Sequence, residues 1–141
     1  MSAEDAKVEL LERVPLFATM SHDQLEELSG IVHEVDVRPG HVLTHEGRHE
    51  GYFFVVVDGS VGIDRGGRTI NTLGPGDFLG EIALLDGGPR TATATAVTDS
   101  RLLSLEHQAF DDLMDTSPSI RAAVMEAVGQ RLRSIDEETP I

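Results

Sequence analysis

The segment from Gly74 to Thr93, GPGDFLGEIALLDGGPRTAT, carries the residues whose types and spacing are best suited to chemistry. Its glycine-rich turns, and a short helix expected from Glu81 to Leu85, would expose backbone N–H groups that favour a bound anion. Arg90 adds a planar fork of donors that matches phosphate oxygens. The carboxylate of Glu81 can accept hydrogen bonds from hydroxyl groups. The segment therefore predicts a sugar-phosphate ligand with a single negative charge.

A second cluster of candidate ligands lies upstream, where His41, His45 and His49 stand four residues apart with Glu46 and Glu50 among them. On a strand, residues four apart share a face but lie about 13 Å from one another. That distance is too long for two side chains to share one metal ion. We therefore expect no metal site here, and we expect these side chains to form a solvated face of the barrel.

The sequence offers no catalytic constellation. It contains neither a G-x-S-x-G nor an HExxH pattern. The absence of cysteine excludes disulfides, thiol catalysis and cysteine-type zinc sites. We therefore expect a protein that is not an enzyme and holds no resident cofactor.

Three regions of different periodicity position the Gly74–Thr93 segment. Residues 3–33 read as helical, residues 34–106 as short strands and residues 107–135 again as helical. Ser21 and Gln24 form a capping-box pattern that places a helix start at His22. Turn signals recur at the spacing of about 8–12 residues that is typical of sandwiches and barrels. The expected fold is α+β but mainly β: a jelly-roll β-barrel flanked by N-terminal helices and a C-terminal helix.

The last helix is expected to start after Ser117, with Pro118 at its first position. An apolar stripe follows one face of it at helical spacing, and this stripe could pack on the barrel or form a homodimer. The opposite face offers small residues that allow close approach. The stripe is Ile120, Val124, Val128, Leu132 and Ile135; the small residues are Ala122, Ala123, Ala127 and Gly129.

Charge and length exclude several classes of partner. The chain has 141 residues, which suits one domain over residues 1–141, and its formal net charge is -14. Nucleic acids and anionic membranes are bound by clustered Lys and Arg, and no such cluster is visible. The N-terminus resembles no signal peptide and no run is long enough to span a bilayer, so we expect a cytoplasmic location.

The Gly74–Thr93 segment resembles the phosphate-binding cassette of cyclic nucleotide-binding domains, the family of the catabolite activator protein and the protein kinase A regulatory subunit. The family pattern is a glycine-aspartate turn, F-G-E-[LI]-A-L, a short loop and P-R-[ST]-A. Here residues 76–85 read GDFLGEIALL and residues 89–92 read PRTA. The resemblance extends over about residues 10–135, and it defines a cassette at residues 76–93.

The resemblance implies a role for each matching position. Glu81 would bind the ribose 2′-hydroxyl, and Arg90 would pair with the cyclic phosphate. Thr91 would add a hydroxyl or backbone N–H bond to that phosphate. Gly80, Ile82 and Ala83 would line the cassette. Four apolar residues could flank the base, although a purely structural role is equally open: Val61, Ile63, Ile70 and Leu73.

The chain ends soon after the last helical apolar position, so we expect a stand-alone domain without the family's helix-turn-helix. The resemblance implies a receptor for cyclic AMP, with cyclic GMP as the other candidate, that acts on an unidentified protein partner through its last helix. One alternative is a protein-interaction module of the same fold that binds no nucleotide. Another is a cupin-like metalloenzyme, although the H-x-H pattern of cupins is missing.

Overall fold

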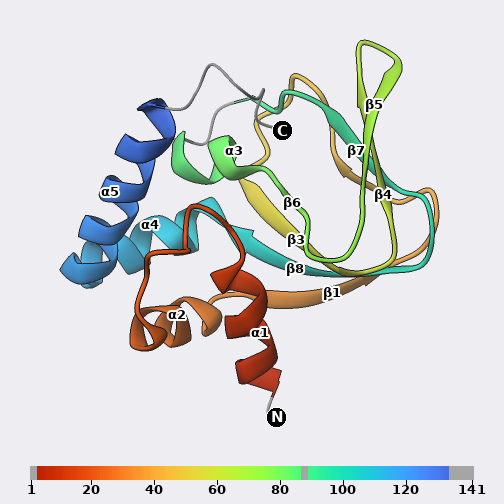
Figure 1. The fold of residues 1–141 in the computed structure, drawn as a ribbon. Helices are drawn as coiled ribbons and strands as arrows, with labels where there is room; N and C mark the ends of the chain where they lie inside the picture. Colours follow the sequence, from red (N-terminus) through yellow and green to blue (C-terminus); the bar gives the residue numbers. More distant parts are fainter. Residues whose placement is uncertain (1–2, 87–88, 134–141) are drawn as a thin grey trace.

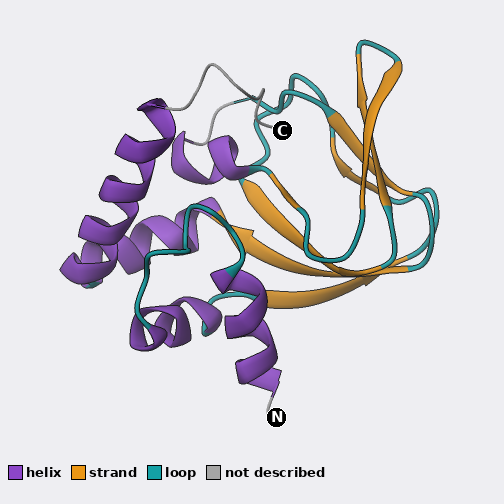
Figure 2. Ribbon diagram, viewed as in Figure 1, coloured by secondary structure: helices purple, strands orange, loops and turns teal. Residues whose placement is uncertain are grey.

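Two four-stranded antiparallel sheets form the β-roll of the molecule, and the helices gather on one side of it (Figures 1 and 2). The computed structural model describes residues 3–86 and 89–133. The first sheet has the order β1-β8-β3-β6 and the second the order β2-β7-β4-β5. This architecture confirms the expected mainly-β jelly roll with flanking helices.

The strands all lie between residues 33 and 106, and the helices α1, α2, α4 and α5 lie before and after them. The strands are β1 His33–Val37, β2 Val42–Thr44, β3 Tyr52–Asp58, β4 Val61–Arg65, β5 Arg68–Leu73, β6 Phe78–Leu79, β7 Thr93–Ala96 and β8 Ser100–Glu106. The helices are α1 Ala3–Glu12, α2 His22–Ser29, α3 Glu81–Asp86, α4 His107–Thr116 and α5 Pro118–Arg133.

Strand β3 is apolar along most of its length because the sheet that contains it is covered on both faces. Phe53 and Val55 point towards the helices, whereas Phe54 and Val56 point into the roll, and all four are buried. In β7 the pattern alternates instead: Ala94 lies in the core of the roll and its threonine neighbours are half-buried. The two patterns agree with the period-2 geometry of strands.

The helices close the outer face of the first sheet around three aromatic rings. Phe17 is fully buried, and its ring centroid lies 5.8 Å from that of Phe53 in an edge-on arrangement. It lies 6.1 Å from the ring of Phe110, which belongs to α4. This cluster joins the N-terminal helices, β3 and the C-terminal helices into one core.

Local signals in the sequence position the helices as predicted. Ser21 and Gln24 form the complete capping box: the Ser21 hydroxyl accepts from the Gln24 backbone N, and the Gln24 side chain accepts from the Ser21 backbone N. Helix α5 begins at Pro118. None of the helices within the described residues is both long enough and apolar enough to cross a bilayer.

The apolar stripe of α5 packs on its own domain where it is described. Ile120 and Val124 are fully buried, and Val128 packs partly buried against the same core. Ala127, which we assigned to the outer face, is buried as well, so the buried face is wider than the predicted stripe. The side chains of Leu132 and Ile135 lie outside the described residues.

We predict that Phe17→Ala lowers the free energy of unfolding by about 3–5 kcal/mol, because it leaves a cavity between Phe53 and Phe110. Met125→Ala is the control, since Met125 is 55% exposed on α5. Urea denaturation, followed by circular dichroism, measures the free energy of unfolding of both variants. Equal losses in the two variants would contradict the central position of Phe17 in the core.

Candidate ligand-binding site

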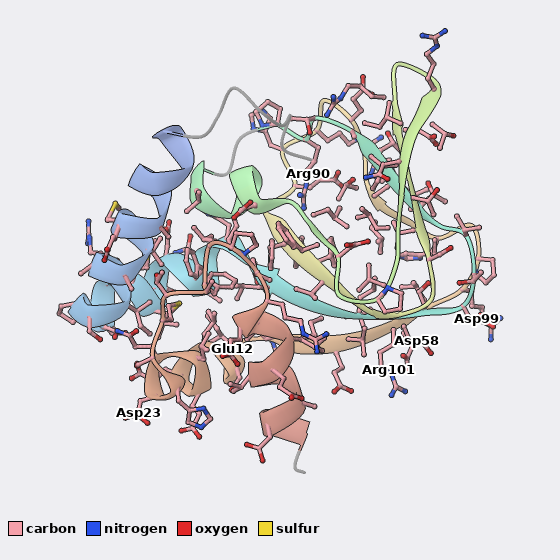
Figure 3. All side chains as sticks on the ribbon, viewed as in Figure 1. Glu12, Asp23, Asp58, Arg90, Asp99 and Arg101 are labelled. Carbon is pink, nitrogen blue, oxygen red and sulfur yellow. The ribbon has the colours of Figure 1, made fainter. Side chains whose placement is uncertain are left out.

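The backbone of Arg90 is fixed on the turn between β2 and β3. Its amide N donates to the Arg48 carbonyl at 2.9 Å, and its carbonyl accepts from the Gly47 amide N, also at 2.9 Å. This two-way pairing places Arg90 at the end of the roll where α3 lies, with its side chain directed inwards (Figure 3). Arg90 is only 6% exposed although it lies in a loop.

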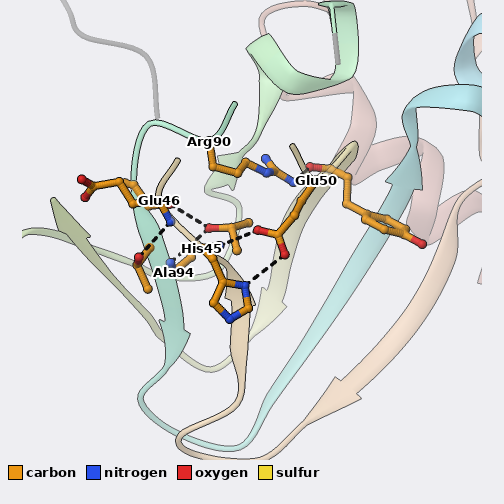
Figure 4. Close-up of polar contacts among 9 residues, drawn as sticks. His45, Glu46, Glu50, Arg90 and Ala94 are labelled. Atoms are coloured by element: carbon orange, nitrogen blue, oxygen red, sulfur yellow. Dashed lines mark hydrogen bonds and ion pairs between the residues drawn. The ribbon is translucent and has the colours of Figure 1, made fainter. Parts of the chain in front are cut away.

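The guanidinium of Arg90 is held against β3 and β6. Its Nη2 donates to the carbonyl of Tyr52, and its Nε is buried and has no hydrogen-bond partner among the described residues (Figure 4). Gly80, at φ +88°, leaves room for this arrangement, because a Cβ on Gly80 would overlap Arg90 Nη1 and the Tyr52 carbonyl oxygen. The glycine therefore serves both the turn and the packing of the arginine.

Burial and a neighbouring carboxylate shift the pKa of Arg90 in opposite directions. Burial lowers the pKa of the Arg90 guanidinium, and the charge of Glu50 partly offsets this shift. Burial alone would raise the pKa of Glu50, but hydrogen bonds from His45 and the charges of His45 and Arg90 lower it. Since its pKa is lowered, Glu50 is ionised at neutral pH and Arg90 has a carboxylate as its electrostatic neighbour.

Glu81 opens α3 immediately after Gly80 and is only 3% exposed. The Leu84 amide N donates to the Gly80 carbonyl at 2.9 Å, which starts the helix at this point. The predicted short helix is thus present as α3. Gly80 lies against the Arg90 guanidinium and adjoins Glu81 in the sequence, and Glu81 and Arg90 are both buried.

The other predicted cassette residues have different environments. Thr91 is exposed, and its carbonyl accepts from Arg65 Nε at 2.9 Å. Ile82 and Ala83 lie in α3, but their side chains are outside the described part of the chain. Among the apolar candidates for the base, Val61, Ile63 and Leu73 are buried in the roll core, whereas Ile70 is 45% exposed on β5.

Four residues with contacts at or near the candidate site were not predicted as site residues from the sequence: Tyr52, Glu50, His45 and Arg65. The His45 and Glu50 positions were expected on a solvated strand face, but β2 ends at Thr44 and both residues lie half-buried in the following turn. Within the described ranges, no group of three or more His, Cys, Asp or Glu residues is arranged to hold a metal ion.

A surface cavity of about 650 Å³ lies at the opposite end of the roll from Arg90 (Figure 3). Asp58, Asp99 and Arg101 line it, together with Asp36. Arg101 and Asp36 form an ion pair of 3.0 Å, and both side chains are mostly exposed to water. We place the candidate site at Arg90 rather than in this cavity, because exposed and paired charges are a poor basis for ligand affinity.

Comparison with known proteins identifies the family. The profile of the cyclic nucleotide-binding domain matches residues 34–117, which include both Glu81 and Arg90. The chain belongs to this family. The match confirms the resemblance found in the cassette, and it covers the whole roll together with α4.

Two curated relatives show the range of proteins that contain this domain. A CRP-like cAMP-activated global transcriptional regulator of Mycobacterium tuberculosis is 29% identical over 130 residues, which cover 89% of this chain. A cyclic nucleotide-gated potassium channel of Mesorhizobium japonicum is 39% identical over 114 residues, which cover 79% of this chain. The chain spans 58% of the regulator and 31% of the channel.

Solved structures of cyclic nucleotide-binding domains superpose well on this chain. The N-terminal domain of a transcriptional regulator from Streptomyces coelicolor A3(2) matches with a TM-score of 0.83 and 35% identity, covering 94% of this chain and 99% of that one. The regulatory domain of Toxoplasma gondii PKA, solved with cAMP, matches with a TM-score of 0.72 and 26% identity, covering 77% and 43%.

We predict that Gly80→Ala destabilises the protein more than Gly76→Ala does. Both glycines have φ near +90°, so both variants incur a backbone cost of about 1–2 kcal/mol. A Cβ on Gly76 would have no neighbour within 4 Å, whereas a Cβ on Gly80 would displace the Arg90 guanidinium. Urea unfolding measures the two losses, and equal values would contradict the close packing of Arg90 on Gly80.

Proposed function

We propose that this domain is a regulatory receptor for a cyclic nucleotide, with cyclic AMP as the first candidate, and that it binds its ligand without catalysing a reaction. The observation that carries the proposal is the joint burial of Glu81 and Arg90 beside Gly80. Arg90 supplies a positive charge with an unused donor, Nε, for a phosphate. Glu81 supplies a carboxylate for the ribose hydroxyl.

The choice of cyclic AMP is supported by the relatives. The mycobacterial regulator is described as cAMP-activated, and the Toxoplasma domain was solved with cAMP. Thr91 follows Arg90 and could add a bond to the phosphate or the base, which keeps cyclic GMP as the second candidate. A domain of this fold that binds no nucleotide is the alternative function.

We predict that calorimetry detects binding of cyclic AMP and that Arg90→Ala weakens it by roughly 2–5 kcal/mol, the usual cost of removing one partner from a buried charge pair. Arg68→Ala is the matched control, because Arg68 is an exposed arginine at the start of β5. Thermal unfolding checks that both variants are folded.

No heat with cyclic AMP or cyclic GMP at millimolar concentration, from folded protein, would contradict the proposed function. It would favour the nucleotide-free interaction module. Equal losses of affinity for cyclic AMP in the Arg90 and Arg68 variants would show that the ligand does not bind at the cassette.

In this proposal, a displacement of α3 on ligand binding is transmitted to α4 and α5 through His107. The His107 ring Nδ1 donates to the carbonyl of Leu84 within α3, and its Nε2 lies 3.3 Å from Asp111 on α4. Leu84 shares a buried cluster with Ile120 and Val124 of α5. A ligand that binds the closed cassette more tightly than the open one would therefore shift α4 and α5 with α3. Met125, exposed on α5, would contribute to a surface for a protein partner or a second copy.

We predict that saturating cyclic AMP changes the amide hydrogen exchange of α5 by severalfold, because Ile120 and Val124 of α5 share a buried core with Leu84 of the helix that carries Glu81. Arg90→Ala protein mixed with the same ligand serves as the control and is expected to show no change. If wild-type protein binds the ligand while exchange in α4 and α5 stays constant, the output does not run through these helices.

A further inference from the structure

The carboxylate of Glu50 is held in place by His45 on the turn that follows β2. One oxygen, Oε1, accepts from the His45 backbone N at 2.6 Å, and the other, Oε2, lies 3.0 Å from the ring Nδ1 of the same histidine. The Glu50 side chain is 25% exposed. Because both oxygens are bonded to one residue, the direction of this negative charge is fixed (Figure 4).

The same turn also positions Arg90, so the two opposite charges are kept together. Gly47 and Arg48 pair with the backbone of Arg90, and the carbonyl of Tyr52 accepts from its guanidinium. Glu50 lies between these anchor points in the sequence, and Figure 4 shows its carboxylate between the His45 ring and Arg90. The interaction of the two charges is also visible in the pKa of each group.

Other charged or titratable groups surround this pair from the neighbouring elements. The turn adds Glu46, Arg48 and His49, which are exposed; α3 adds the buried Glu81; β4 adds Arg65, bonded to the Thr91 carbonyl; and α4 adds His107, paired with Asp111. The charge of Glu50 acts on Arg90 and partly offsets the effect of burial on the pKa of the guanidinium.

The positive charge of Arg90 is therefore already opposed within the protein before a phosphate arrives. A ligand with one negative charge can still bind, because its phosphate and the Glu50 carboxylate then share the positive charge of Arg90. A second negative charge on the phosphate would be repelled by the Glu50 carboxylate and would compete with it for the positive charge of Arg90. In a partly buried site, unit charges interact much more strongly than they do in water.

We propose that Glu50, held by His45, is a specificity-determining residue that selects singly charged phosphate diesters against doubly charged phosphate monoesters. This inference rests on the proposed function. It gives the site a way to distinguish a cyclic nucleotide from the ring-opened monophosphate that a phosphodiesterase releases. The two ligands share base and sugar, and they differ in ring closure and in charge.

Three ligands separate charge from ring closure: cyclic AMP, adenosine 5′-monophosphate and adenosine 5′-(methyl phosphate). The monophosphate is a dianion at pH 8, because its second pKa is about 6. The methyl ester is an open-chain monoanion, so it differs from the monophosphate chiefly in charge. Calorimetry with each ligand gives the ratio of the dissociation constants of the monophosphate and the methyl ester.

In wild-type protein at pH 8 we expect the methyl ester to bind at least about tenfold more tightly than the monophosphate, the order of effect that one unit charge exerts in such a site. In Glu50→Gln we expect this ratio to fall towards one. Glu46→Gln is the matched control, because Glu46 is an exposed carboxylate on the same turn, and it is expected to keep the wild-type ratio. A ratio within one variant is unaffected by a general loss of affinity.

Wild-type protein alone also tests the inference if Glu50→Gln does not fold. Between pH 8 and pH 5.5 the monophosphate gains its second proton, so the ratio is expected to decline towards one. A wild-type ratio near one at pH 8, a ratio independent of pH, or a wild-type ratio in Glu50→Gln would each overturn the role of Glu50. Absence of cyclic AMP binding would instead overturn the proposed function.

Discussion

The burial of one guanidinium, that of Arg90, is the constraint on which the arrangement of this domain depends. Burying a charge is costly unless hydrogen bonds and opposite charges accompany it. Here the carbonyl of Tyr52 supplies a hydrogen bond and the carboxylate of Glu50 an opposite charge, while the β2–β3 turn holds the backbone of Arg90. Three segments distant in sequence must therefore meet, and β3 makes this possible because it pairs with both β8 and β6 in one sheet.

The division of the core into two clusters connects this site to the helices. One cluster fills the roll, and the other lies between the first sheet and the helices. Leu84, one turn after Gly80 on α3, belongs to the helical cluster together with Phe110 and Ile120. Because close-packed interiors transmit displacement, we expect a movement of the cassette to displace residues of this cluster.

The parts of the site that were predictable are those encoded by neighbours in sequence. Gly80, Glu81 and α3 form one continuous segment, and Arg90 lies on the loop that follows it, so a local pattern suffices to find them. The contacts of Arg90 were not predictable, because Tyr52 lies 38 residues away in the sequence and meets Arg90 only in the folded chain. His45 and Glu50 were misplaced for a related reason: β2 ends at Thr44, so the strand geometry assumed for them does not apply.

The negative net charge of the chain makes anion binding depend on this local arrangement. With a net charge of -14, the protein as a whole repels anions, so an anionic ligand depends on the cation it meets at short range. Arg90 Nε is buried without a partner among the described residues, and an unsatisfied buried donor costs about 1–3 kcal/mol. A phosphate oxygen at that donor would remove this cost. The proposed role of Glu50 follows from the same constraint, since its carboxylate would repel a second negative charge on the ligand.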